Sequence, residues 1–186
     1  MPEQTKPQSR RLVVILFVIY LVLLTWTILW KLEIPWVGEA ALLPRPWKLV
    51  PFVASGDAGA SIPREILANI LLFVPFGVYL GFLAPSWQWW KAGGVFLATS
   101  LILEVIQHLL STGSFDSTDV ITNTVGGLAG LGLMFLIRRT LRNRTPVIMT
   151  RVLVIATAIF VLAAVIFIAS PLHYSAPRDV LVTMTP

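Results

Sequence analysis

The sequence contains no cysteine, and only 12% of its 186 residues are charged. The absence of cysteine excludes disulfides, thiolate nucleophiles and thiolate metal ligands. A soluble domain carries about 25% charged residues, so the scarcity of charge argues against a water-soluble fold. Disorder is excluded as well, because 56% of the residues are hydrophobic. These limits leave an integral membrane protein with a single helical domain.

Apolar runs of membrane-spanning length occur five times along the chain. A helix that crosses a bilayer needs about 20 mainly apolar residues. We therefore predict an all-α fold, a polytopic helical membrane bundle of about five transmembrane helices at residues 12–30, 66–84, 92–110, 119–137 and 152–170. The first run follows a basic N-terminus, as a signal peptide would. No small-residue cleavage site follows it, which favours a retained anchor.

These spans divide the chain into segments. We expect a cytoplasmic N-terminus at 1–11, a membrane domain at 12–140, a basic cytoplasmic loop with the fifth helix at 141–170, and an extracytoplasmic tail at 171–186. Within the membrane domain, residues 31–63 form an outer segment rich in proline and tryptophan. An irregular or half-helical interfacial segment and a floppy loop are equal alternatives for it.

The distribution of lysine and arginine predicts the orientation. With the N-terminus inside, the cytoplasmic side carries nine basic residues and one acid, and the opposite side carries five basic residues and seven acids. Short cytoplasmic loops are rich in lysine and arginine, so we predict N-in and C-out. We interpret the basic run 138–144 as a topogenic loop that meets anionic lipid, not as a nucleic-acid patch. Membrane lipids are therefore the expected partners, and nucleic acid is not.

Polar residues inside the third predicted span are the first functional signal. Glu104 lies roughly 9 Å below the outer boundary at a rise of 1.5 Å per residue. An acidic side chain at that depth is costly unless it is paired or faces a cavity. Helical spacing gathers the polar residues of this span on one face: Ser100, Glu104, Gln107, His108 and Ser111. We expect this stripe to face the interior of the bundle.

The neighbouring spans carry matching polar residues. In the predicted topology, all of these sets fall in the outer half of the bilayer. We therefore predict one pocket, open to the outer surface, with the following ligand-binding residues: Arg64, Asn69, Glu104, Gln107, Asp116, Asp119 and Asn123.

Each of these features also has a purely structural interpretation. Asp116 could cap the helix that follows it. Gln107 and Asn123 could form hydrogen bonds between helices, and His108 could simply be solvated. The glycine pairs of the second and fourth spans are best interpreted as packing devices: Gly77 with Gly81, and Gly126 with Gly130.

Acid–base chemistry remains an alternative to binding. The catalytic candidates are Glu104, His108 and Asp119, acting on a lipid or cell-wall intermediate. The same acids and histidine match no standard metal spacing, so we predict no metal and no cofactor. Our prediction leans towards a protein that is not an enzyme.

Several motifs are similar to those of a known family. Residues 69–77, NILLFVPFG, resemble the N-x-L-x-F-x-P-x-G signature of the VanZ-like membrane proteins. Residues 104–107 and 114–126 are similar to the family's E-x-x-Q and S-x-D-x-x-D-x-x-x-N-x-x-G elements. Residues 49–52 resemble its N-L-x-P-F element, with Lys48 in the place of the asparagine. The resemblance covers roughly residues 12–140.

One departure concerns charge. The family usually carries an arginine just before the S-F-D element, where this chain has Gly113. If that arginine pairs with the acidic cluster or an anionic ligand, Arg64 would have to replace it.

The resemblance implies a multi-pass protein of the bacterial cytoplasmic membrane. The family's named member is linked to glycopeptide (teicoplanin) resistance, and its biochemical activity is unsettled. We therefore expect the outer pocket to bind a lipid, a lipid-linked envelope precursor or a lipophilic, glycopeptide-type antibiotic. The oligomeric state and the ligand's identity do not follow from the sequence.

Overall fold

The computed structural model describes residues 7–32, 47–53 and 63–170. Its helices are α1 (Pro7–Trp30), α2 (Pro63–Leu83), α3 (Trp89–Leu109), α4 (Ser117–Leu141), the short 3-10 helix η1 (Arg142–Arg144) and α5 (Thr145–Ala169). These ranges contain no β-strand, only an isolated β-bridge between Lys48 and Asp116. The predicted all-α class is confirmed.

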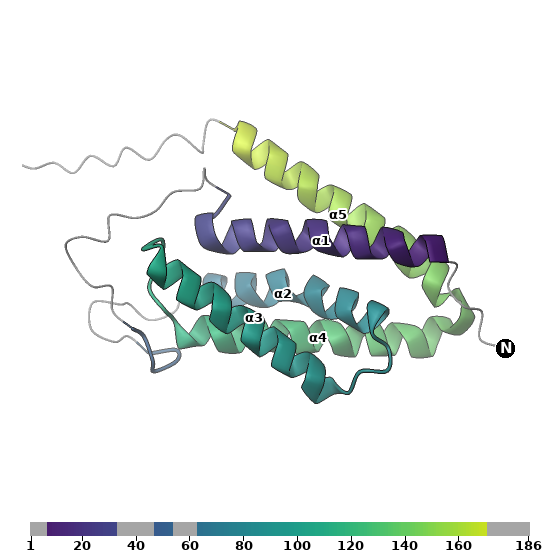
Figure 1. Ribbon diagram of the computed structural model, residues 1–186, viewed down its shortest axis with the longest axis horizontal. Helices are drawn as coiled ribbons and strands as arrows, with labels where there is room; N and C mark the ends of the chain where they lie inside the picture. The colour runs from purple at the N-terminus through teal and green to yellow at the C-terminus, as the bar shows by residue number, and fades with distance from the viewer. Residues whose placement is uncertain (1–6, 33–46, 54–62, 171–186) are drawn as a thin grey trace, which may run out of the picture.

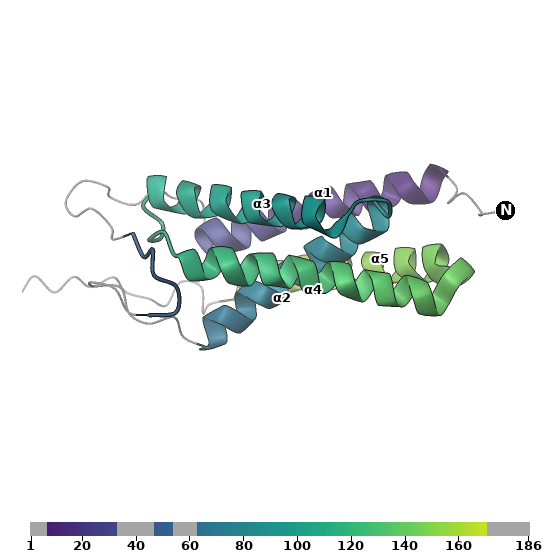
Figure 2. The same cartoon turned by 90° about the horizontal axis from the view of Figure 1, so that it is seen from below.

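The helices lie along one long axis and form a bundle (Figure 1). α2 packs most extensively against α4, α3 also packs against α4, and α1 packs against α5. Figure 2 shows that α2 crosses α4 obliquely. The α2–α4 contact is therefore the centre of the fold.

Glycines make this close helix contact fit. A Cβ atom on Gly77 would overlap the carbonyl oxygen of Gly127, and one on Gly130 would overlap the carbonyl oxygen of Val74. Gly126 meets the backbone of α2 in the same way. Small residues spaced four apart let helix backbones approach closely in a membrane. The predicted packing role of these three glycines is confirmed.

An aromatic cluster joins α1 to α2. The Tyr79 ring lies 5.2 Å from the Phe17 ring and 5.6 Å from the Tyr20 ring, centroid to centroid. Pro75 interrupts the hydrogen-bond ladder of α2 because it has no amide hydrogen. The Tyr20 hydroxyl donates to the carbonyl of Leu72 in that disturbed turn. A hydrogen bond from α1 thus supports α2 beside its proline.

Four continuous helical stretches of the described residues are long and apolar enough to cross a membrane: Arg10–Trp30, Pro63–Leu83, Trp89–Leu109 and Ser117–Ala169. The last stretch holds both α4 and α5, which run in opposite directions and meet at η1 (Figure 1). The connection between them is only the three residues of η1, because both helices extend beyond the apolar runs that predicted them. The count of five spans and the N-in orientation remain predictions.

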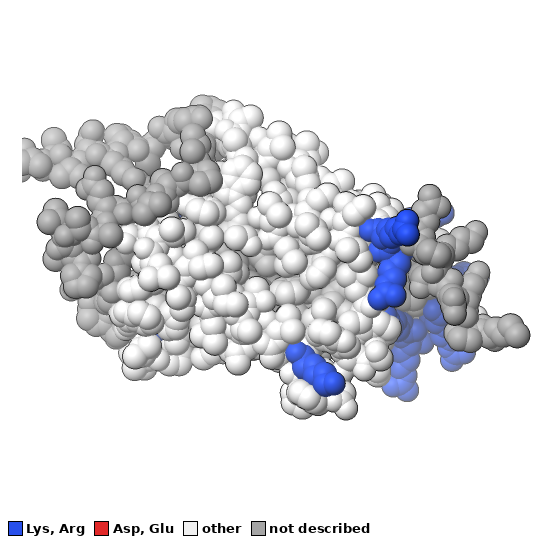
Figure 3. Space-filling model, viewed as in Figure 1, with Lys and Arg blue, Asp and Glu red and all other residues white. Residues whose placement is uncertain are grey.

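Charge separates the two ends of the bundle. We call the end where α1 and α5 begin the basic end, and Figure 3 shows lysine and arginine gathered towards it. It carries Arg10, Arg11, Arg138, Arg139, Arg142 and Arg144. We call the opposite end the acidic end, because all four acids of the described residues lie there: Glu65, Glu104, Asp116 and Asp119.

Some predictions fall outside the described residues. They concern residues 1–6, most of the outer segment (33–46 and 54–62) and the tail at 171–186.

Candidate binding site at the acidic end

Residues 47–53 are fixed to the start of α4 by backbone hydrogen bonds. The Lys48 amide donates to the Phe115 carbonyl at 2.9 Å, and the Ser117 amide donates to the Lys48 carbonyl at 3.0 Å. The Phe52 amide donates to the Thr118 hydroxyl at 2.9 Å. These three bonds place Lys48 directly beside the N-terminus of α4.

Asp116 is the centre of the site. It is the N-cap residue of α4, and its Oδ1 accepts a hydrogen bond from the Thr118 amide at 2.7 Å. Its Oδ2 lies 2.9 Å from Nζ of Lys48, whose side chain is only 3% exposed. Burial raises the pKa of Asp116, but the hydrogen bonds from Lys48 and Thr118 outweigh it and leave that pKa below its ordinary value. The capping role is confirmed, and an ion pair is added to it.

Glu104 lies beneath Asp116 and is 2% exposed. Its Oε2 accepts a hydrogen bond from the Asp116 backbone amide at 3.0 Å. Ser100, one turn earlier on α3, is fully buried. The two buried positions of the stripe therefore face the bundle interior, where Glu104 joins α3 to the cap of α4.

Asp119 and Asn69 meet across the α2–α4 interface. The Asn69 side chain interacts with the Asp119 carboxylate, on which the charges of Asp116 and Glu65 also act. Asp119 acts electrostatically on Glu104 as well. Four predicted ligand-binding residues are thus brought together: Asn69, Glu104, Asp116 and Asp119.

Asn123 continues the polar path into the bundle. Its side-chain amide donates to the Ser100 hydroxyl at 2.9 Å, and both residues are buried. Its Oδ1 atom is buried and has no hydrogen-bond partner among the described residues. Asn123 therefore links α3 to α4 and still has an acceptor that is not used.

Gln107 and His108 take other partners. The Gln107 amide donates to the Ile28 carbonyl at 2.8 Å and joins α3 to α1. The His108 ring packs against the Trp47 ring with centroids 4.4 Å apart. Its Nδ1 is buried without a hydrogen-bond partner in the part of the chain that is described. Gln107 thus makes the interhelical bond of its structural interpretation.

Comparison with known proteins identifies the family. The sequence profile of the VanZ/LLP1 family matches residues 17–138, more than half of the chain. The chain belongs to the VanZ/LLP1 family. It is 35% identical over 129 residues to Protein VanZ of Enterococcus faecium, and the alignment covers 69% of this chain and 77% of that protein. No solved structure matches the chain. The resemblance inferred from the motifs is confirmed.

The matched region contains every residue of the acidic site and ends before α5. Family membership and the apolar helices together indicate a multi-pass membrane protein. Within this VanZ/LLP1 framework, the motif residues Asn69, Glu104 and Asp116 lie on three different elements and meet at one end of the bundle.

The structure shows which cation serves the site. Arg64 is exposed at the start of α2, whereas Lys48 forms the ion pair with Asp116. Lys48, not Arg64, therefore supplies a positive charge in a chain that has Gly113 before the S-F-D element. The sequence reasoning missed Lys48 as a site residue, although its replacement of the expected asparagine was a signal.

No group of three or more histidine or acidic residues in the described ranges is placed to hold a metal ion. Cavities of about 770, 530, 420 and 310 Å³ lie elsewhere in the bundle. The acidic site is held together by the Lys48–Asp116 ion pair and by the hydrogen bond from the Asp116 amide to Glu104.

Proposed function

We propose that the acidic end of this VanZ-like protein binds the polar part of an amphiphilic envelope molecule at the outer leaflet of a bacterial cytoplasmic membrane. The ligand class is a lipid, a lipid-linked envelope precursor or a lipophilic, glycopeptide-type antibiotic. The observation that supports this proposal is the ordered cluster of Lys48, Glu104, Asp116 and Asp119 at one end of an apolar bundle.

The chemistry of the cluster favours one kind of headgroup. The carboxylates of Asp116 and Asp119 outnumber the Lys48 ammonium group, so the cluster offers a ligand more hydrogen-bond acceptors than charged donors. Amines and hydroxyls donate to carboxylates, whereas a phosphate would be repelled. A ligand that presents amines or sugar hydroxyls therefore fits this site better than a simple phospholipid.

The carboxylates have different accessibility. The Asp116 side chain is 17% exposed, whereas Glu104 is buried and bonded to the Asp116 backbone. We therefore assign ligand contact to Asp116 and Asp119, and to Glu104 the positioning of the loop that carries Asp116. The family's association with glycopeptide resistance would follow if the bound molecule is the antibiotic or its envelope target.

The enzyme alternative uses Glu104, His108 and Asp119, with Glu104 and His108 as an acid–base pair. Instead, Glu104 bonds to Asp116 and the His108 ring packs on Trp47. The described residues contain no hydrogen bond between Glu104 and His108. Binding is therefore the better-supported function.

A photocrosslinking experiment tests the proposal. The purified protein in nanodiscs is exposed to a diazirine-bearing teicoplanin and to a diazirine-bearing lipid-linked disaccharide, and labelled peptides are mapped. We expect at least one probe to label residues 47–53 or the first turns of α4. Asp119→Asn should reduce labelling about tenfold, because it removes a charge-assisted hydrogen bond.

Thr124→Val is the matched control, because its hydroxyl bonds only to the Val120 carbonyl of the same helix. Labelling that is equal in wild type, Asp119→Asn and Thr124→Val would contradict the binding proposal. Turnover of an envelope lipid extract that Glu104→Gln abolishes would support the enzyme alternative instead.

A further inference from the structure

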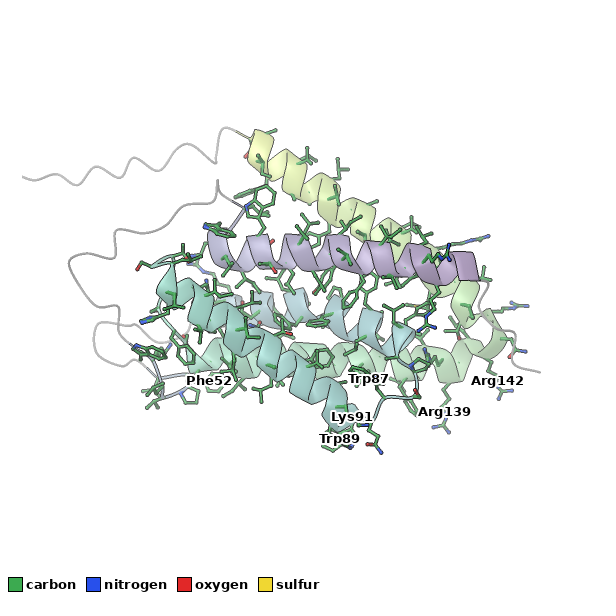
Figure 4. All side chains as sticks on the ribbon, in the orientation of Figure 1. Phe52, Trp87, Trp89, Lys91, Arg139 and Arg142 are labelled. Carbon is green, nitrogen blue, oxygen red and sulfur yellow. The ribbon has the colours of Figure 1, made fainter. Side chains whose placement is uncertain are left out.

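A cavity of about 770 Å³ opens at the basic end, far from the acidic site. Its walls come from the start of α1, the end of α2 with the turn that follows, the end of α4, and the start of α5. We call it the head cavity. Figure 4 labels two of its residues, Trp87 and Arg142, at this end of the bundle.

Three arginines line the head cavity. Arg10 comes from α1, Arg138 from the last turn of α4 and Arg142 from η1. Arg138 is fixed, because its guanidinium donates to the Phe82 carbonyl at the end of α2. The described residues that line the cavity include no acid. Three guanidinium groups around one cavity attract an anion, and arginine favours phosphate oxygens because it can donate two parallel hydrogen bonds.

A buried threonine also lines this cavity. Thr145, the first residue of α5, lines the cavity and is 5% exposed. Its Oγ1 has no hydrogen-bond partner among the described residues. Buried polar atoms are nearly always bonded, so this hydroxyl is a spare hydrogen-bonding group in a residue of the cavity wall.

A second, more apolar cavity of about 530 Å³ adjoins the first. The two share four lining residues: Ala84, Pro85, Trp87 and Arg138. Beyond them, leucine, methionine and phenylalanine side chains of α4 line this second cavity, which we call the tail groove. Gly132 keeps the groove open, since a Cβ there would have no described atom within 4 Å.

A free phosphate would fill only the head cavity, whereas an amphiphile would fill both. Trp87 lies where the two cavities meet, and tryptophan favours the boundary between headgroups and acyl chains. We propose that the basic end binds one anionic phospholipid, with its phosphate between Arg10, Arg138 and Arg142 and an acyl chain in the tail groove. The Thr145 hydroxyl donates to a headgroup oxygen.

This site is independent of the acidic site in position and in charge. The lipid would join the start of α1 and α5 to the end of α2 and α4, a region where α4 and α5 contact each other little. Binding should therefore raise the thermal stability of the bundle, because a ligand that binds only the folded state stabilises it.

The test is photocrosslinking in phosphatidylcholine nanodiscs that contain a small fraction of phosphatidylglycerol with a diazirine in its acyl chain. We expect labelling of α4 between Leu128 and Phe135. The double variant Arg10→Gln/Arg142→Gln should reduce this labelling about fivefold, which corresponds to the loss of roughly one hydrogen bond. The variant Gly132→Leu fills the tail groove and should reduce the labelling by about the same factor, because it removes contacts with the acyl chain.

Matched control variants distinguish a specific lipid-binding site from general electrostatic attraction between arginine and the membrane surface. Arg139→Gln/Arg144→Gln removes the same charge from the same end, and neither residue lines the head cavity. Gly94→Leu adds the same side chain on α3, where a Cβ also meets no described atom. Both controls should label like wild type. Thr145→Val removes only an unpaired hydroxyl, so it should fold even if the arginine variant does not, and it should also lower labelling.

Three outcomes would overturn the proposal. Equal losses in the two double arginine variants would show diffuse attraction to the membrane surface. Equal labelling by a matched diazirine phosphatidylcholine would show a lipid shell without headgroup selection. Competition by glycerol phosphate as effective as competition by phosphatidylglycerol would show that the cavity binds a soluble phosphate.

Discussion

The acidic end and the basic end of this bundle use charge in opposite ways. At the acidic end, Lys48 pairs with the Asp116 carboxylate and Glu104 accepts from the Asp116 amide, so the protein itself supplies partners for these charged side chains. At the basic end, Arg10 and Arg142 surround a cavity without an acid among its described lining residues. Removing one partner of a buried ion pair is strongly destabilising, whereas a cavity lined by charges of one sign attracts a ligand of the opposite charge.

Each end also contains a buried polar atom that has no hydrogen-bond partner among the described residues. Asn123 Oδ1 at the acidic end and Thr145 Oγ1 at the basic end are both buried without a partner in the described ranges. Asn123 still holds Ser100 through its amide, so only half of its capacity is unused. Thr145 also lines a cavity, so a ligand bound there would lie beside this residue.

The largest effect should come from removing the Lys48–Asp116 ion pair at the acidic end. Lys48→Met should lower the free energy of unfolding by about 3 kcal/mol, because it leaves the Asp116 carboxylate without its buried partner. Unfolding by dodecyl sulfate, followed by tryptophan fluorescence in micelles, measures this change.

The double variant Lys48→Met/Asp116→Asn checks the pairing. Asparagine also caps helices well, so more than half of the lost stability should return once no charge is left unpaired. Strictly additive losses would show that Lys48 and Asp116 do not depend on each other.

The next effect contrasts two glycines of α4, one packed and one open. Gly130→Ala should destabilise the protein by about 2 kcal/mol, because the new Cβ overlaps the Val74 carbonyl oxygen. Gly132→Ala should be neutral or stabilise by up to about 1 kcal/mol, because the site is open and alanine favours helix. The same unfolding assay compares them, and similar losses in both would contradict the open groove.

Much of this architecture could be predicted from sequence. Apolar runs gave the helices, and the spacing of Ser100 and Glu104 predicted that they face inward. Helix ends were predicted less well, because α4 and α5 continue through polar residues up to η1. Hydropathy cannot detect helical turns that lie beyond the apolar run.

The partners were harder to predict than the positions. Lys48 reaches Asp116 through backbone bonds between segments 68 residues apart, which no local pattern encodes. Gln107 bonds to a carbonyl of α1 because of how the helices pack. The basic residues near 138–144 predicted only topology, since the head cavity requires the ends of four helices to come together.

A smaller effect concerns pH at the acidic end. The pKa of Asp116 lies below its ordinary value, so the folded state favours the charged form. This contribution to stability is complete above the ordinary aspartate pKa and is lost as the pH falls through the lowered value. Wild type should therefore lose more stability than Asp116→Asn as the pH falls from 7 to below the ordinary aspartate pKa. Parallel pH profiles of the two proteins in the unfolding assay would contradict the ion pair.

The smallest expected effect is a gain in stability, and it tests the basic end. In lipid-free micelles, Thr145→Val should stabilise the protein by up to about 1 kcal/mol, because it replaces an unpaired buried hydroxyl with a methyl group of similar size. With phosphatidylglycerol present, the variant should lose that advantage, since wild type then gains a hydrogen bond that valine cannot make. Thermal unfolding without phosphatidylglycerol measures the gain in stability, and thermal unfolding with it measures the loss of that gain. A variant that is destabilised in both conditions would show that the Thr145 hydroxyl already has a partner within the protein and is not reserved for a lipid oxygen.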